Sequence, residues 1–310
     1  MGLALTYTVA ARTWYIKDTY VGTDFLTSWK WETLDDPTHG RVNYVDQPSA
    51  LNSNLTYASD DKFIMRADAY QIVPPSARGR DSVRITSKKA YDESLIVLDL
   101  NHMPTGCGTW PAFWTLSRAG PWPNGGEIDI IEGVHTNTKN LASLHTTPGC
   151  TMSEPRGQNG DTVSSNCDTS VSYNQGCGTS FKKPNSYGAP FNAVGGGFFA
   201  IQRSKSSVAV WFWTRDDPAV PQAVRTGVGN VSVDESWGLP EARFPMGDGC
   251  GYEEHMDRHV MIFDTTFCGD WAGATYTSAG CPGTCNDYVN NNPEKFTEAY
   301  WEINALRVYV

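Results

Sequence analysis

Hydrophobic residues along this chain fall into short runs, separated by turns that are rich in Gly, Pro, Asn and Asp. The sequence has no long stretch with the 3.6-residue period of an amphipathic helix. This pattern is typical of an all-β protein built as a sandwich or barrel. The strands that it predicts lie at residues 83–87, 95–100, 109–116, 127–134, 141–146, 198–203, 208–213, 259–267 and 303–310.

Other segments complete the predicted organisation. One short helix is predicted at residues 293–300, which begin with a proline. The polar stretch 151–186 is predicted to be a long loop held by Cys150, Cys167 and Cys177. Because no repeat or linker divides the sequence, residues 12–310 are expected to form a single domain. Residues 1–11 are interpreted as an N-terminal extension, either the end of a signal peptide, an altered start or a native strand.

One predicted strand carries three carboxylates between isoleucines, in the sequence GEIDIIEGV of residues 126–134. In a regular strand Glu127 and Asp129 point to the same face, whereas Glu132, five positions after Glu127, points to the other. A one-residue bulge at the doubled isoleucine would bring Glu132 to the face of the other two acids. The sequence therefore predicts both a bulge and a cluster of three acids.

Clustered carboxyl groups suit glycosidic bond cleavage, because each shifts the pKa of its neighbours and one can keep a proton while another is charged. Four strand steps span about 13 Å. Two glutamates that lean together across a concave sheet would bring their carboxyl groups to roughly 5–6 Å, which is nearer the ~5–5.5 Å of retaining glycosidases than the ~6.5–9.5 Å of inverting ones. The alternatives are a solvated acidic edge strand and a calcium site formed by the three acids.

Aromatic side chains near the acids are candidates for stacking on sugar rings. Trp110 and Trp114 are four positions apart in one predicted strand and so share a face, while Trp122 and Trp271 lie in turns rich in glycine. For each tryptophan alone, a place in the core is the alternative. His145, on the next predicted strand, is a candidate site residue or a structural histidine.

Composition narrows the partners and the compartment. A formal net charge of −10 argues against nucleic acid and is compatible with a neutral polymer. The eight cysteines favour four disulfides and secretion over a zinc site. The glycosylation sequons at Asn54 and Asn230 agree with secretion, and the sequence has no transmembrane segment. A Ser-His-Asp hydrolase is not supported, because the chain has no Gly-x-Ser-x-Gly motif.

The acidic motif resembles the bulged Glu-x-Asp-x-x-Glu signature of glycoside hydrolase family 16, laminarinase branch. Further segments are similar to the secreted basidiomycete endo-β-1,3(4)-glucanases of that family, and the resemblance covers nearly all of the chain from residue 12 onwards. They are residues 36–46, 106–112, 122–126, 267–273 and 287–293. The segment 251–259 departs from the family pattern in being more charged, which would alter substrate preference if it borders the cleft.

The resemblance implies a β-jelly-roll sandwich of two antiparallel sheets with a concave glucan-binding cleft. It also implies retaining hydrolysis of β-1,3- and mixed-linkage β-1,3/1,4-glucans by a monomer, with no cofactor and no metal among the site residues. Some relatives carry a structural calcium away from the cleft, and no ligands for one are assigned in this sequence. Glu127 matches the nucleophile, Glu132 the acid/base and Asp129 the auxiliary acid of the family. The positions that match cleft residues are Trp110, Trp114, Trp122, His145 and Trp271, with Asn43 and Arg84 as glycone-side contacts.

Two other functions remain compatible with the sequence. Transglycosylation would replace water by a sugar acceptor, although the unbulged motif is more usual in the family's transferases. A β-glucan-binding protein without catalysis is the second alternative, and the three intact acids argue against it.

Overall fold

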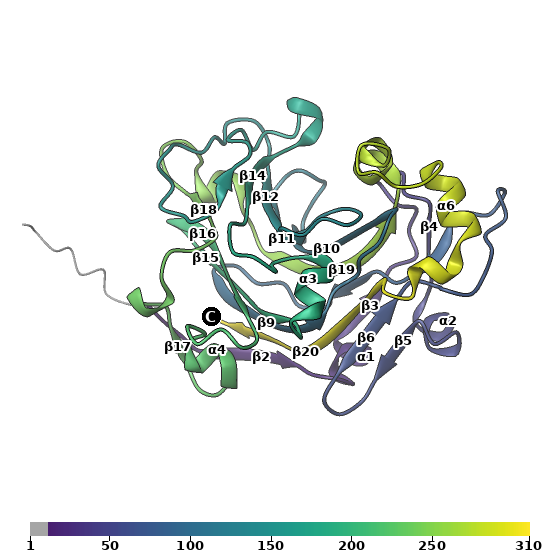
Figure 1. The fold of residues 1–310 in the computed structure, drawn as a ribbon. Coiled ribbons are helices and arrows are strands. Elements are labelled where there is room, and N and C mark those ends of the chain that lie inside the picture. Colours follow the sequence, from purple (N-terminus) through teal and green to yellow (C-terminus); the bar gives the residue numbers. More distant parts are fainter. Residues whose placement is uncertain (1–11) are drawn as a thin grey trace, which may run out of the picture.

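The computed structural model describes residues 12–310, so the predicted N-terminal extension lies outside the described residues. Two eight-stranded sheets lie face to face (Figure 1), and in both of them all neighbouring strands run antiparallel. The front sheet has the order β13 (Asp161–Thr162), β14 (Cys177–Ser180), β12 (Leu141–His145), β11 (Glu127–Glu132), β10 (Thr109–Ser117), β19 (His259–Phe267), β8 (Ile85–Ser87) and β3 (Trp29–Trp31).

The back sheet lies beneath the front sheet. Its order is β18 (Ala242–Pro245), β16 (Ser207–Thr214), β15 (Gly197–Ser204), β9 (Ser94–His102), β20 (Tyr300–Tyr309), β6 (Phe63–Arg66) and β5 (Thr56–Ala58), and β2 (Ile16–Tyr20) also pairs with β20. Two small pairs flank the sandwich: antiparallel β1 (Thr13–Trp14) with β17 (Val231–Ser232), and parallel β4 (Val42–Tyr44) with β7 (Arg80–Ser82).

The helices are short and lie in the connections between strands. The α-helices are α1 (Asp24–Ser28), α2 (Gln47–Asn52), α3 (Gly188–Ala193), α4 (Gln222–Thr226), α5 (Tyr252–His255) and α6 (Cys285–Asn291). The other helical turns are η1 (Ser172–Asn174), η2 (Glu235–Trp237), η3 (Gly269–Gly273) and η4 (Pro293–Phe296). In the described residues, no helix is long and apolar enough to cross a membrane.

The main core fills the space between the two sheets and explains why the strands alternate. On β10, Phe113 points inward and stacks on Phe263 of β19 at 4.2 Å, and Phe263 meets Trp301 of β20 edge-on at 5.4 Å. All three are at most 1% exposed. Truncating such a buried aromatic to alanine typically costs about 3–5 kcal/mol. The inward positions therefore fix the register, and the alternate positions of β10 and β11 are free to face solvent.

The predicted strands are all present, and the two-sheet fold is confirmed. The predicted helix at 293–300 is confirmed only in its first half: the helical turn η4 begins at Pro293 as predicted but ends at Phe296. Tyr300 already belongs to β20, where Trp301 and Ile303 pack into the core. The prediction of one long loop at 151–186 is also wrong in part. β13 and β14 lie within it, because backbone pairing with β12 extends the front sheet there.

Two of the four disulfides join segments that are 174 and 100 positions apart in the sequence, and the other two close short loops. All eight cysteines are paired, as Cys107–Cys281, Cys150–Cys250, Cys167–Cys177 and Cys268–Cys285. The predicted four disulfides are therefore confirmed. Such bonds persist in oxidising compartments, so the chain has the character of an extracellular or secretory-pathway protein.

Candidate active site

β11 carries the three acids, and a bulge places them on one face. Opposite β11 on β10, the paired residues step directly from Ile131 to Asp129, so Ile130 has no partner of its own. The pairing with β12 shifts at the same place. Ile130 and Ile131 both lie in the core, while Glu127, Asp129 and Glu132 all line one cleft. The bulge predicted from strand parity is confirmed.

A buried asparagine stabilises the bulge. An inserted residue leaves backbone groups without ladder partners, and such groups are costly when buried. The side chain of Asn140, fully buried, donates to the carbonyl of Ile130 at 2.8 Å and accepts from the backbone N–H of Glu132 at 3.1 Å. Asn140 thus satisfies the bulge on both sides and fixes where Glu132 leaves the strand.

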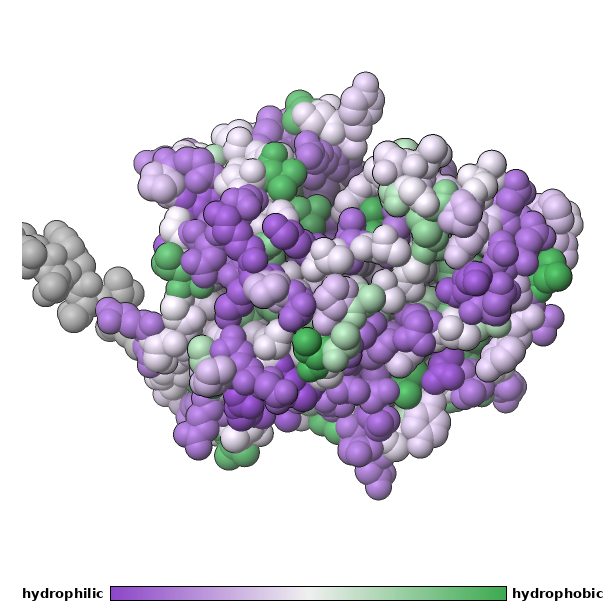
Figure 2. All heavy atoms as spheres, in the orientation of Figure 1, coloured by the Kyte–Doolittle hydropathy of each residue, from purple (hydrophilic) through white to green (hydrophobic). Residues whose placement is uncertain are grey.

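The acids lie at the base of a cleft of about 470 Å³. In the view of Figure 2 the surface is hollowed at the top, above the strands labelled β10 and β11 in Figure 1. Thr169 and Asn174 line it from the segment before β14, and Asp270 lines it from η3. The remaining lining residues are Asp36, Pro37, Thr38, Arg84, Trp110, Ala112, Trp114, Leu116, Trp122, Glu127, Asp129, Glu132, Asp264 and Thr266.

Each glutamate accepts a hydrogen bond from a tryptophan. The indole N–H of Trp122 donates to Glu127 at 2.7 Å, and that of Trp110 donates to Glu132 at 2.9 Å. A hydrogen bond to a carboxylate is shorter and stronger than one between neutral groups. The two predicted sugar platforms are therefore also fixed to the two candidate catalytic groups.

Asp129, which lines the cleft, forms an ion pair with His145. The ring nitrogen Nε2 of His145 lies 3.3 Å from Asp129 Oδ2, and Nδ1 lies 2.9 Å from Asn174 Oδ1. Burial alone would lower the pKa of His145, but Asp129, helped by Glu127 and Glu132, outweighs it and raises that pKa to about 10. His145 is therefore a cation at neutral pH, next to three carboxyl groups.

The surroundings shift both glutamates in the same direction. Burial, followed by the charge of Asp129, raises the pKa of Glu127 and of Glu132 to about 8. The charge of His145 and the indole hydrogen bonds lower these pKa values and so oppose the shift. The charge of Glu127 also raises the pKa of Glu132, so Glu132 keeps its proton more readily once Glu127 has ionised.

A second buried acid, which the sequence analysis did not single out, holds Trp114 in place. The indole N–H of Trp114 donates to Asp264 Oδ1 at 2.8 Å, and the hydroxyl of Tyr44 donates to the other carboxylate oxygen at 3.0 Å. Arg84 lies 5.0 Å from the Trp114 ring. Burial raises the pKa of Asp264 and the charge of Arg84 opposes this. The sequence did contain a signal for this residue, because Asp264 interrupts the apolar run of a predicted strand, as Glu127, Asp129 and Glu132 do.

The remaining predicted residues lie at different distances from the cleft. Trp271, in η3, meets Trp110 edge-on at 5.6 Å and so stands beside the Glu132 end. Asn43 is not among the lining residues, and its amide instead donates to Asp81 at 2.6 Å. A glucan contact of Asn43 therefore remains a prediction without support from the cleft geometry.

A metal ion is a second possible use of this cluster. Ligand atoms of Glu127, Asp129 and His145 lie within 4.8 Å of one another. Metal binding would need a free lone pair on the ring nitrogen. Both ring nitrogens of His145 face oxygen atoms, one of Asp129 and one of Asn174, and this favours an N–H at each position. The arrangement is that of an ion pair between the imidazolium of His145 and the carboxylate of Asp129.

Fold and site together define a carbohydrate-cleaving β-sandwich with paired carboxyl groups in an open cleft. The family model for the catalytic GH16 domain of XgeA-like proteins matches residues 29–309. The chain belongs to glycoside hydrolase family 16.

Individual relatives cover almost the whole chain. Laminarinase 16A from Phanerochaete chrysosporium, solved with two β-glucans, is 48% identical, with a TM-score of 0.93 over 96% of this chain and 100% of that one. An elongating family 16 β-1,3-glucosyltransferase is 37% identical, with a TM-score of 0.87 over 96% and 100%. A probable glycosidase of Schizosaccharomyces pombe is 42% identical over 96% of this chain.

Several relatives are longer than this chain. It spans 70% of the Schizosaccharomyces pombe glycosidase and 40% of a probable endo-1,3(4)-beta-glucanase of Aspergillus niger, to which it is 39% identical over 97% of its own length.

Proposed function

We propose that this protein is a retaining endo-β-1,3(4)-glucanase. The observation that carries the proposal is the face of β11, where the bulge brings Glu127, Asp129 and Glu132 into one cleft and each glutamate accepts an indole hydrogen bond. Two carboxyl groups with raised pKa values, in which the charge of Glu127 raises the pKa of Glu132, supply one nucleophile and one acid, as retaining hydrolysis requires.

The proposed reaction has two steps. Glu132, protonated, donates its proton to the glycosidic oxygen while the carboxylate of Glu127 attacks the anomeric carbon, so that the glycosidic bond breaks and a glycosyl ester forms. Glu132, now ionised, then removes a proton from water, which attacks the same carbon and releases Glu127. Asp129 is paired with His145 at 3.3 Å, and the reaction needs no cofactor.

The substrate class follows from the cleft and from the relatives. Trp110, Trp114 and Trp122 offer apolar faces along its floor, which suits the C–H faces of glucose rings. A net charge of −10 is compatible with a neutral glucan. An open cleft lets a long polymer pass across the acids, and this supports internal cleavage.

The test is an assay with laminarin and lichenan, followed by proton NMR of the earliest products. We expect both glucans to be cleaved internally, with new reducing ends first seen as the β-anomer. An initial α-anomer would overturn retention. Cleavage of laminarin alone would restrict the proposal to β-1,3-glucan.

Transglycosylation is a second candidate, because one 37% identical relative is an elongating β-1,3-glucosyltransferase. In that reaction a sugar hydroxyl takes the place of water in the second step. Adding laminari-oligosaccharide acceptors to the assay separates the two, since products longer than the donor form only by transfer. The balance between transfer and hydrolysis depends on which acceptor the cleft binds beyond Glu132.

We also propose that residues 12–310 act as one secreted, monomeric catalytic domain. Both sheets share a single core, and four disulfides support passage through an oxidising compartment. The sequon residues Asn54 and Asn230 are both exposed, as glycosylation requires. Secretion of the glycosylated monomer from its native host, checked by mass spectrometry and light scattering, tests this proposal.

A further inference from the structure

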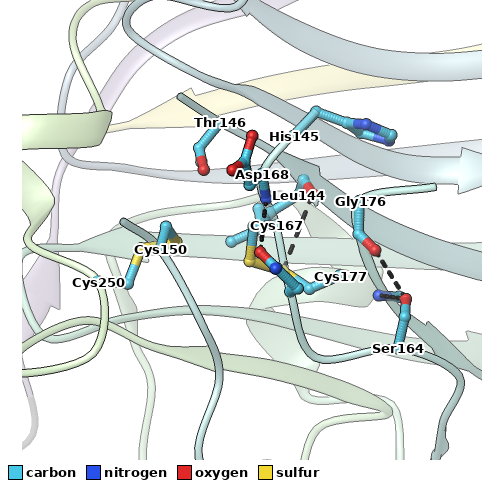
Figure 3. Close-up of a disulfide and its surroundings, with 12 residues drawn as sticks. Leu144, His145, Thr146, Cys150, Ser164, Cys167, Asp168, Gly176, Cys177 and Cys250 are labelled. Carbon is cyan, nitrogen blue, oxygen red and sulfur yellow. Dashed lines mark hydrogen bonds between the residues drawn. A yellow bond between two sulfur atoms is a disulfide. The ribbon is translucent and has the colours of Figure 1, made fainter. Parts of the chain in front are cut away.

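A disulfide-closed loop lies directly beside His145. Cys177, in β14, pairs with Leu144 of β12, and the backbone N–H of Thr146 donates to the carbonyl of Cys167 at 2.8 Å. The bond Cys167–Cys177 therefore joins segments anchored on both sides of His145. Figure 3 shows this disulfide beside Leu144, with Cys150–Cys250 to its left and the pair Ser164 and Gly176 to its right.

The tip of this loop has an unusual backbone. Ser172, Tyr173 and Asn174 have φ values of 51°, 56° and 60°, although none of them is glycine. Left-handed conformations are disfavoured for L-residues and persist only where the surroundings impose them. Tyr173 is fully exposed, so the turn is not formed to bury that side chain. What the turn does provide is the 2.9 Å contact between Asn174 Oδ1 and His145 Nδ1.

The segment that leads from the loop tip back to β14 packs against the imidazole ring of His145. Gly176 has a φ of 64°, and a Cβ at this position would lie 2.5 Å from the carbonyl oxygen of Leu144 and 2.8 Å from Cε1 of His145. Its carbonyl accepts from the hydroxyl of Ser164 at 2.7 Å, which in turn accepts from the backbone N–H of Gly178 at 2.9 Å. Glycine is thus required for the backbone to press against the imidazole.

We propose that Asn174 is a positioning residue, which acts through His145 by accepting a hydrogen bond from its Nδ1 and so aiming Nε2 at Asp129. This proposal rests on the proposed function for its effect on catalysis. The loop that the disulfide closes is then part of the catalytic apparatus, although Asn174 itself performs no chemical step.

The consequence concerns how charge is balanced in the cleft. The charged groups that face the His145 ring are Asp129, Glu127 and Glu132, all from β11, whereas Gly176 and Cys177 bring no charge from the side of β14. The charge of His145 lowers the pKa of both glutamates, which burial and Asp129 raise. If the ring turned away, Asp129 would act on both glutamates without its counter-ion.

The first test uses the unmodified protein. In ¹⁵N-labelled protein at pH 6, we expect both ring nitrogens of His145 to be protonated, with a slowly exchanging proton at Nδ1; a His145→Gln variant identifies the signals. A His145 that has no proton at Nδ1 would overturn the proposal. Because this measurement needs no substrate, it holds whether or not the protein cleaves laminarin.

The second test compares three variants of the loop. Asn174→Leu removes the acceptor, and we expect loss of the protected Nδ1 proton. Because the charge of His145 then moves away from Glu127, the acid limb of the pH profile of kcat/KM should shift to higher pH by about one unit. Asn174→Asp keeps an acceptor and should restore the Nδ1 signal. Ser170→Ala, in the same loop and bonded only to Asp168, is the matched control and should leave both readouts unchanged.

The variants also distinguish positioning from simple lining of the cleft. If Asn174→Leu raised KM alone and kept the acid limb and the Nδ1 signal, Asn174 would be an ordinary contact residue and the proposal would be wrong. Failure of the wild-type protein to cleave β-glucan, with the Nδ1 proton present and lost in Asn174→Leu, would count against the proposed function and leave the positioning role standing.

Discussion

The two glutamates of β11 share one cleft but have different surroundings. Glu127 precedes the bulge and lies opposite His145 on β12, and its indole partner, Trp122, comes from a turn and is 45% exposed. Glu132 follows the bulge, and its partner Trp110 belongs to the neighbouring strand β10. One glutamate thus lies opposite a cation, and the other is bonded to an indole of the neighbouring strand.

This difference explains how one chain assigns two roles to the same side chain. Among the influences that lower the pKa of Glu127, the charge of His145 is the largest, whereas for Glu132 the hydrogen bond from Trp110 comes first. The charge of Glu127 adds to that of Asp129 in raising the pKa of Glu132, so ionised Glu127 helps to hold the proton on Glu132. The geometry accordingly favours Glu127 as the nucleophile and Glu132 as the acid/base.

The largest effect is expected from Glu127→Ser. Loss of the nucleophile removes the covalent step, and we expect kcat on laminarin to fall by about 10⁴-fold or more while glucan binding remains measurable. Rates in the presence of azide extend the test. Azide enters the space left at Glu127 and should give an α-glycosyl azide. A β-glycosyl azide from this variant would mean that Glu132 is the nucleophile and Glu127 the acid/base.

Glu132→Gln should have a smaller effect that depends on the leaving group. General acid catalysis contributes about 10²–10⁴-fold, so we expect a loss of that size on laminarin. An activated aryl β-glucoside needs no proton for departure, and its first step should be nearly unaffected. Equal losses on both substrates would contradict the role of Glu132 as the acid.

The pH dependence of kcat/KM should reveal the pair. Activity requires Glu127 ionised and Glu132 protonated, so the rate should fall at low pH as Glu127 gains a proton and at high pH as Glu132 loses its own. With the pKa values of both groups raised to about 8, the alkaline limb should lie near pH 8. An alkaline limb near pH 5 would mean that burial does not raise the pKa of Glu132.

The contrast between the two glutamates was only partly predictable from the sequence. Strand parity is a local rule, so the position of the bulge and the shared face of the three acids followed from the order of residues 126–134 alone. The pairing of Asp129 with His145 and the support from Asn140 depend on which strand lies next to β11. That neighbour is fixed by the packing of the whole sheet.

The loop segments show the limit more clearly. Residues 151–186 contain few apolar residues, and no periodicity indicated that β14 would join the sheet or that Asn174 would reach His145. The short strands β2, β3, β5 and β6 were also missed, because runs of three to five residues give little pattern. In these segments tertiary contacts, and not local preference, determine the structure.

Smaller effects should separate the two indole hydrogen bonds. Trp122→Phe removes the donor to Glu127 and keeps an aromatic face, so the pKa of Glu127 should rise and the acid limb should move to higher pH. Trp110→Phe should raise the pKa of Glu132 and move the alkaline limb to higher pH. We expect activity losses of about 10- to 100-fold in each case, since a hydrogen bond to a charged group is worth about 1.5–3 kcal/mol. A shift of the same limb in both variants would contradict the separate roles.

The smallest effect concerns stability, and its sign follows from the raised pKa values. In the unfolded chain Glu132 has the ordinary pKa of 4.5, and in the folded protein it has a pKa of about 8. Between these values the folded state holds a proton that the unfolded state releases, so stability falls as pH rises from 4.5 to 8 and the penalty is complete above 8. Glu132→Gln removes the ionisable group, and we expect its Tm to exceed that of the wild type by several degrees at pH 9 and to match it at pH 4. The same exchange at Glu127 should give a smaller gain, because ionised Glu127 also stabilises the cation of His145. Thermal unfolding of both variants across this pH range measures the difference, and equal gains would mean that the cation opposite Glu127 does not distinguish the two glutamates.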